Sequence, residues 1–118
     1  MGADNNHVIA RLTQAAAGLL YLSESDYPFE LIQWDGPTEP TPEFIRNVAG
    51  EPEGSPIQML EVDQFLNSGR YQRLLLALQH ELSDLRAYKV GRINMPVYVV
   101  GLSREGSWLG VATRVVET

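Results

Sequence analysis

The chain has 118 residues, of which 44% are hydrophobic, and its formal net charge is −6. We expect one folded domain over residues 1–118, because this length and composition suit a single core. The chain contains no cysteine, which excludes disulfides, thiolate metal sites and cysteine nucleophiles. No apolar run approaches the roughly 18–20 residues that span a membrane. The first residues also lack the basic and apolar regions of a signal peptide, so we expect a cytoplasmic protein.

The charges are divided unevenly along the chain. Residues 12–69 hold ten acidic side chains and one basic side chain, a net charge of −9. Residues 70–104 hold six basic and two acidic side chains, a net charge of +4. An acidic surface disfavours direct binding of nucleic acid, whose phosphates need basic partners. It is compatible with binding a protein that itself binds nucleic acid. The alternative interpretation is that the acids are solvated loop residues that maintain solubility.

The first half of the chain predicts two helices and one strand. Asp4 or Asn5 can cap a helix, and apolar residues then recur with helical spacing. Residues 35–56, after the first strand, hold five of the seven prolines and predict a long loop. In chain order, the expected elements are a helix at 8–20, a turn at 23–28, a strand at 29–34, and a loop at 35–56 that contains a short helix at 43–48.

The second half predicts a helix followed by a three-stranded meander. Leucines at positions 74, 75, 78, 82 and 85 mark one face of a helix. Turn residues separate the apolar runs that follow it. The expected elements are a strand at 57–62, a helical turn at 63–66, a helix at 70–87, and strands at 88–93, 97–102 and 108–116. This order predicts an α+β fold, with helices packed on a mostly antiparallel sheet of about four to five strands.

A coherent catalytic constellation is missing from the sequence. His80-Glu81 opens like a zinc-protease motif, but position 84 is Asp84 where the second histidine is needed. Ser103 lacks the glycine two residues later that a nucleophile elbow requires. Glu24 and Asp26 could form a carboxylate pair, but any acidic turn offers one. We therefore expect a protein that is not an enzyme and needs no cofactor.

Two segments resemble the nuclease A inhibitor family. Residues 18–30 read GLLYLSESDYPFE and continue to WDG at 34–36. Residues 97–101 read VYVVG, and residues 109–118 read LGVATRVVET. The intervening elements fall in the same order as in the family, so the resemblance covers nearly the whole chain. It implies a three-layer α/β/α sandwich and a function as a proteinaceous nuclease inhibitor.

The resemblance also implies a partner and a binding site. The family's targets resemble ββα-metal nucleases, which cut DNA and RNA and hold one divalent cation. In the family, the glutamate of the Ser-Glu-Ser turn and the C-terminal threonine enter the nuclease active site and reach the metal where substrate phosphate would sit. These positions are Glu24 and Thr118 here, and they would meet the metal only through a nuclease bound one-to-one. The partner-binding residues implied around them are Ser23, Ser25, Asp26 and Glu117.

One departure from the family leaves alternatives open. The family's acidic insertion, with a tryptophan that packs on the nuclease, is replaced here by residues 67–71, NSGRY. Tyr71 is the aromatic candidate for the lost contact. A second hypothesis is therefore a diverged member that binds another basic or metal-bearing protein. A third is a small metal-binding or hydrolytic protein that uses Glu24 and Asp26.

Overall fold

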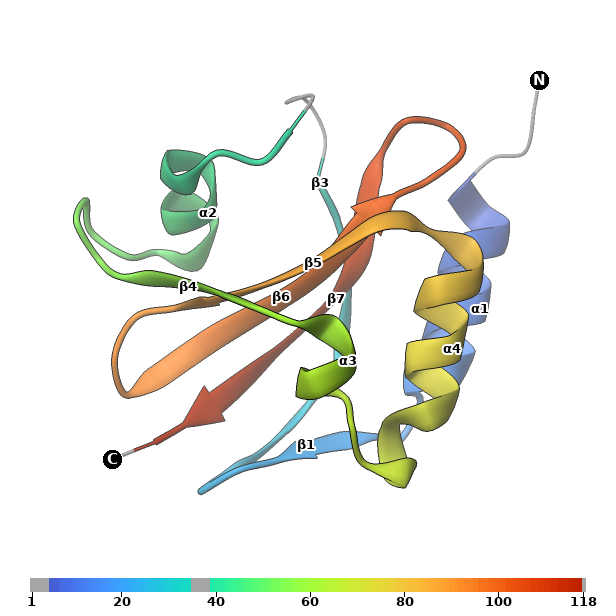
Figure 1. Ribbon diagram of the computed structural model, residues 1–118, viewed down its shortest axis with the longest axis horizontal. Helices are drawn as coiled ribbons and strands as arrows, with labels where there is room; N and C mark the ends of the chain where they lie inside the picture. The colour runs from blue at the N-terminus through green and yellow to red at the C-terminus, as the bar shows by residue number, and fades with distance from the viewer. Residues whose placement is uncertain (1–4, 35–38, 118) are drawn as a thin grey trace.

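The computed structural model describes residues 5–34 and 39–117. Along these ranges, helices at the start and middle alternate with strands, and three long strands complete the fold (Figure 1). The elements are α1 (Asn5–Ala16), β1 (Leu20–Leu22), β2 (Asp26–Pro28), β3 (Glu30–Trp34), α2 (Pro42–Ala49), β4 (Ile57–Leu60), α3 (Val62–Phe65), the 3₁₀ turn η1 (Gly69–Tyr71), α4 (Gln72–Glu81), β5 (Ser83–Val90), β6 (Asn94–Leu102) and β7 (Trp108–Val116).

Five strands form one antiparallel sheet in the order β3-β7-β6-β5-β4. The predicted α+β fold and mostly antiparallel sheet are confirmed. Strands β6 and β7 are its longest pair, in register from Asn94 opposite Val116 to Leu102 opposite Trp108. Gly110 belongs to this pair, and a Cβ atom there would overlap the backbone of Val99 and Val100. Glycine is therefore required where the two central strands approach each other.

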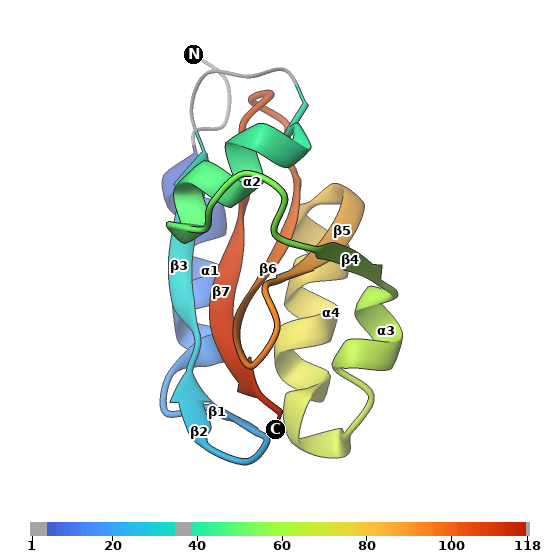
Figure 2. The same cartoon turned by 90° about the vertical axis from the view of Figure 1, so that its left-hand side faces the viewer.

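Side chains alternate between two cores along the central strands, because successive residues of a strand point to opposite faces. In β6, Val97 and Val99 join the core that contains α1 and α4. Tyr98 and Val100 join the core that contains Ile45 of α2. Figures 1 and 2 show α1 and α4 on one side of the sheet and α2 on the other. The sheet is thus packed on both faces.

Helix α2 has signals for both of its ends in the sequence. The Thr41 side chain accepts a hydrogen bond from the backbone N–H of Phe44 at 3.1 Å, and Pro42 occupies the first turn. Gly50 ends the helix in the left-handed conformation, with φ of 72°. The short helix predicted at 43–48 is confirmed over Pro42–Ala49. None of the helices within 5–34 and 39–117 is both long and apolar enough to cross a membrane.

The expected helix at 70–87 is wrong in its last turn. Helix α4 ends at Glu81, and Leu82 is extended, with φ of −127° and ψ of 153°. Strand β5 then begins at Ser83, with an irregular register between Ser83 and Arg86. Pairing with β6 satisfies the backbone hydrogen-bonding groups of β5. This stabilisation outweighs the helical preference that the leucine spacing indicates.

The segment expected to be a simple turn at 23–28 is also different in the structure. It forms the tip and second strand of a hairpin, in which Leu20 lies opposite Pro28 and Leu22 lies opposite Asp26. This two-stranded β1–β2 hairpin is separate from the main sheet. Both strands have three residues, so the alternation that identifies a strand in a sequence is too short to detect.

Candidate partner-binding site

The tip of the β1–β2 hairpin is fixed to the end of β7. The side-chain oxygen of Ser23 accepts a hydrogen bond from the backbone N–H of Val116 at 3.1 Å. The backbone N–H of Glu24 donates to the carbonyl oxygen of Val116 at 3.3 Å. Figure 2 shows the hairpin and the end of β7 at the same end of the molecule. The Ser-Glu-Ser turn and the end of β7, which are far apart in sequence, are therefore neighbours.

Serine chemistry shapes the turn itself. The hydroxyl of Ser23 also donates to the carbonyl oxygen of Ser25 at 2.8 Å, which closes the tip over Glu24. Short hydroxyl side chains favour turns because they bond to nearby backbone groups. Glu24, Ser25 and Asp26 are exposed. The predicted residues of this segment thus lie together on an exposed tip that carries two carboxylates.

Glu117, the residue that follows β7, is also held by contacts with other segments. The backbone N–H of Glu117 donates to the carbonyl oxygen of Ile93 at 3.0 Å. Its carboxylate lies 3.7 Å from the ammonium nitrogen of Lys89, and its side chain is 58% exposed. Glu117 therefore lies next to the residue that bonds the turn. Thr118, predicted as the second residue to enter the nuclease, lies outside the described residues.

Stacked aromatic rings support the hairpin from below. The Tyr21 ring stacks on Phe65, with centroids 4.3 Å apart, and on Tyr71, with centroids 5.1 Å apart. The Tyr21 hydroxyl donates to the carbonyl oxygen of Phe65 at 3.2 Å. Burial, with smaller contributions from Tyr71 and Glu117, raises the pKa of Tyr21 above its usual value. This stack anchors β1 to α3 and η1.

Tyr71 is part of this support. It is 5% exposed, and its hydroxyl oxygen accepts a hydrogen bond from the backbone N–H of Leu22 at 3.0 Å. A ring with so little exposed surface cannot offer a large aromatic contact to a partner. The expectation of a direct contact is corrected accordingly: Tyr71 is buried and holds the hairpin through the backbone of Leu22.

A cleft of about 350 Å³ adjoins the chain end. Sequence analysis missed it, because its walls come from β1, β4, α3, β5 and the end of β7, and no local pattern connects them. Glu61, an exposed acid that was not among the predicted site residues, lies on its border. The residues that line the cleft are Tyr21, Met59, Leu60, Glu61, Gln64, Phe65, Lys89, Val115 and Glu117.

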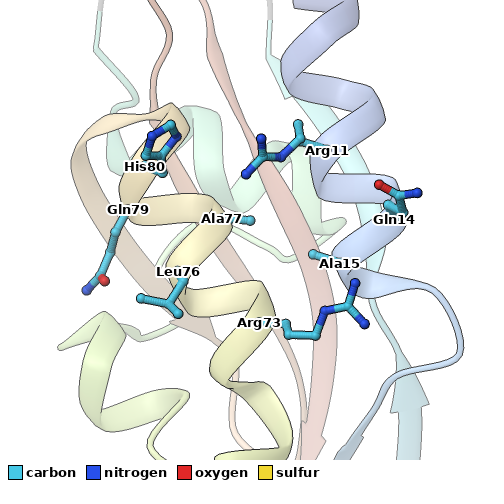
Figure 3. Close-up of a pocket in the computed structure, with 8 residues that line it drawn as sticks. All are labelled: Arg11, Gln14, Ala15, Arg73, Leu76, Ala77, Gln79 and His80. Carbon is cyan, nitrogen blue, oxygen red and sulfur yellow. The ribbon is translucent and has the colours of Figure 1, made fainter.

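A wider groove lies elsewhere, between α1 and α4, and has a volume of about 520 Å³ (Figure 3). It contains Arg11, Arg73 and His80 and none of the predicted site residues. His80 and Arg11 both contact the carboxylate of Glu81, at 3.1 Å and 3.8 Å, so His80 is an exposed helix residue in a small polar cluster. Across the described ranges, no group of three or more histidine, aspartate or glutamate residues could hold a metal ion.

Comparison with known proteins identifies the family. The sequence pattern of the nuclease A inhibitor-like proteins matches residues 6–118, which is nearly the whole chain. Comparison with curated proteins gave no match. The family match covers both the hairpin tip and the β7 end, the two segments that the structure joins through Val116. The chain belongs to the nuclease A inhibitor-like protein family.

Proposed function

We propose that this protein is a stoichiometric inhibitor of a divalent-metal-dependent, sugar-non-specific nuclease of the ββα-metal type. Glu24 and the chain end at Thr118 enter the nuclease active site together and occupy the position of substrate phosphate. The observation that carries the proposal is a pair of hydrogen bonds at Val116: its backbone N–H donates to the Ser23 hydroxyl oxygen, and its carbonyl oxygen accepts from the backbone N–H of Glu24. Two groups that must fit one cleft have to lie close together, and these bonds support that requirement.

The chemistry of the tip suits a phosphate mimic. Hard cations such as magnesium prefer oxygen ligands and keep open positions for phosphate. A carboxylate supplies such an oxygen without offering a phosphodiester bond to cleave. Arginine side chains in a nuclease site would add charge-assisted hydrogen bonds to the same oxygens. Glu24 at an exposed tip can reach into a concave site, whereas a carboxylate on the flat sheet could not.

Rigidity of the tip supports tight binding. Ordering a loop on association costs free energy, and a loop that is already ordered avoids that cost. The Ser23 hydroxyl bonds both within the turn and across to β7, and Tyr71 holds β1 through Leu22. These contacts restrain the turn in the free protein. Ser23 and Tyr71 thus act on the partner through the position of Glu24.

Exposed acids around the tip complement a basic groove. Asp26 lies beside Glu24 at the start of β2, and Glu117 lies at the end of β7. A nuclease groove that binds phosphates is basic. Charges at the border of such an interface act mainly on the association rate, and steering can raise it to about 10⁸–10⁹ M⁻¹s⁻¹ at low salt.

The test is a titration of a magnesium-dependent ββα-metal nuclease, with plasmid DNA as substrate. The protein should inhibit with saturation near one-to-one. Glu24→Ala and deletion of Thr118 should each weaken inhibition by about tenfold or more, as expected for a residue at an interface centre. Glu53→Ala is the matched control, because Glu53 is an exposed acid in the segment after α2.

Each result of this titration has one meaning. If Glu53→Ala weakened inhibition as much as Glu24→Ala, the effect would come from net charge. That result would contradict the insertion of Glu24 into the active site. Absence of inhibition by the wild-type chain, against the nuclease from its own source, would contradict the proposal. It would favour a different basic or metal-bearing protein as the partner.

A further inference from the structure

We propose that the cleft beside Glu117 receives one apolar side chain from the partner nuclease, projecting from the basic surface that borders its nucleic-acid groove. This inference rests on the proposed function and adds a second point of contact to it. The cleft would anchor the complex, while Glu24 occupies the active site. Neither the match to the family nor the motif at 23–30 assigns a role to this cleft.

The interior of the cleft favours an apolar guest. Tyr21, Leu60, Phe65 and Val115 line it from four different elements. The Tyr21 and Phe65 rings are stacked and joined by a hydrogen bond from the tyrosine hydroxyl, so this wall is preformed. A volume of about 350 Å³ exceeds that of a single large side chain. Apolar and aromatic anchors that fill preformed pockets dominate the affinity of many interfaces.

The rim of the cleft favours a basic surface around that guest. Glu61 and Glu117 contribute two carboxylates, and Lys89 contributes one ammonium, which leaves a local charge of −1. Lys89 is 16% exposed in its side chain, whereas Glu117 is 58% exposed. Glu117 is therefore more accessible to a partner than Lys89, and Glu61 is exposed as well. A polar rim around an apolar pocket is the usual arrangement at a binding hot spot.

Continuity with the acidic tip identifies the same partner for both sites. Glu117 lines the cleft, and it follows Val116, which bonds Ser23 and Glu24. A protein that covers Glu24 and Glu117 therefore covers a residue that lines the cleft. Glu61 adds a further acidic side chain at the cleft, and Lys89 is the one basic residue among the described residues that line it. The same basic partner surface would therefore complement both the tip and the cleft.

The test fills the cleft and measures binding to the nuclease. Gln64 lies in α3 at the border of the cleft and is exposed, so Gln64→Trp can block the cleft without disturbing the core. Gln14→Trp is the matched control, because Gln14 is an exposed glutamine on α1 that borders the other groove. Thermal unfolding of each variant establishes that it is folded.

We expect Gln64→Trp to weaken nuclease inhibition by about tenfold, mainly through faster dissociation, since affinity changes within one interface arise chiefly in the dissociation rate. Glu61→Gln should weaken it by a smaller factor and through slower association. Gln14→Trp should match the wild type. Glu24→Ala, measured in parallel, reports on the proposed function alone.

The outcomes separate the two proposals. Loss of inhibition in Glu24→Ala together with wild-type dissociation in Gln64→Trp would overturn the cleft inference and leave the proposed function standing. Absence of inhibition by the wild-type chain would overturn both. A concentration-dependent dimer that Gln64→Trp abolishes, with unchanged inhibition, would show that a second copy of this chain occupies the cleft and would also overturn the inference.

Discussion

The side-chain oxygen of Ser23 accepts a hydrogen bond from the backbone N–H of Val116 at 3.1 Å, across 93 positions of sequence. Together with the hydrogen bond from the backbone N–H of Glu24 to the Val116 carbonyl oxygen, this contact joins the tip of the β1–β2 hairpin to the last residue of β7. Because the sheet holds β7 along nine residues, the tip is positioned by the central part of the fold. The proposed inhibitory surface is therefore as rigid as the sheet end that supports it.

Replacing Ser23 by alanine tests this connection. Ser23→Ala removes the acceptor for Val116 and the donor to Ser25. We expect the free energy of unfolding to fall by about 1 kcal/mol. Inhibition should weaken by more than this loss of stability explains, because Glu24 is no longer held in place. Amide hydrogen exchange at Val116 should accelerate. Thr13→Ala is the control, because Thr13 is an exposed residue of α1. It should leave inhibition and hydrogen exchange at Val116 unchanged.

Replacing Tyr71 by phenylalanine separates ring packing from hydrogen bonding. Tyr71→Phe keeps the stack on Tyr21 but removes the acceptor for the backbone N–H of Leu22. The free energy of unfolding should fall by about 1 kcal/mol, because a part-buried hydrogen bond is lost. Hydrogen exchange at Leu22 should accelerate. An unchanged exchange rate there would contradict the positioning role of Tyr71.

Alkaline pH should destabilise the protein through Tyr21. Burial, Tyr71 and Glu117 raise the pKa of Tyr21 above its ordinary value of 10.0, so the folded state holds the phenolic proton more tightly than the unfolded state. The resulting stability is complete below pH 10.0 and is lost as pH rises through the folded pKa. Thermal unfolding measured across this range should show the loss, and Tyr21→Phe should reduce it. Ultraviolet titration that finds every tyrosine ionising at its ordinary value would contradict this.

Two glycines should respond differently to alanine. Gly110→Ala places a methyl group against the backbone of Val99 and Val100, and should cost about 3 kcal/mol or more, as backbone displacement in a core does. Gly69→Ala meets nothing within 4 Å and has no positive φ, so its effect should stay below about 1 kcal/mol. Denaturant unfolding of both variants measures the contrast. A similar small loss in both would show that the central strands can separate.

Several features follow from the sequence alone, because their signals are local. The Thr41 cap, Pro42 and Gly50 define helix α2 within ten positions. The apolar runs of β6 and β7 and the turn between them predict that hairpin, and the motif from Ser23 to Glu30 predicts the family that the match over residues 6–118 confirms. The residues Phe29, Trp34 and Trp108 are buried, as their size and hydrophobicity indicate.

Other features depended on contacts between distant segments, and only the tertiary structure decided them. The leucines at 82 and 85 continue a helical spacing, yet Leu82 lies beyond the end of α4 and Leu85 lies in β5, which pairs with β6. The sequence makes Tyr71 a candidate for a partner contact, but in the structure its ring stacks on Tyr21 and its hydroxyl accepts a hydrogen bond from Leu22. The cleft at Glu61 assembles residues from positions 21 to 117. Local propensity does not predict such contacts, because their energy comes from packing and hydrogen bonds that form only when distant segments meet in the folded protein.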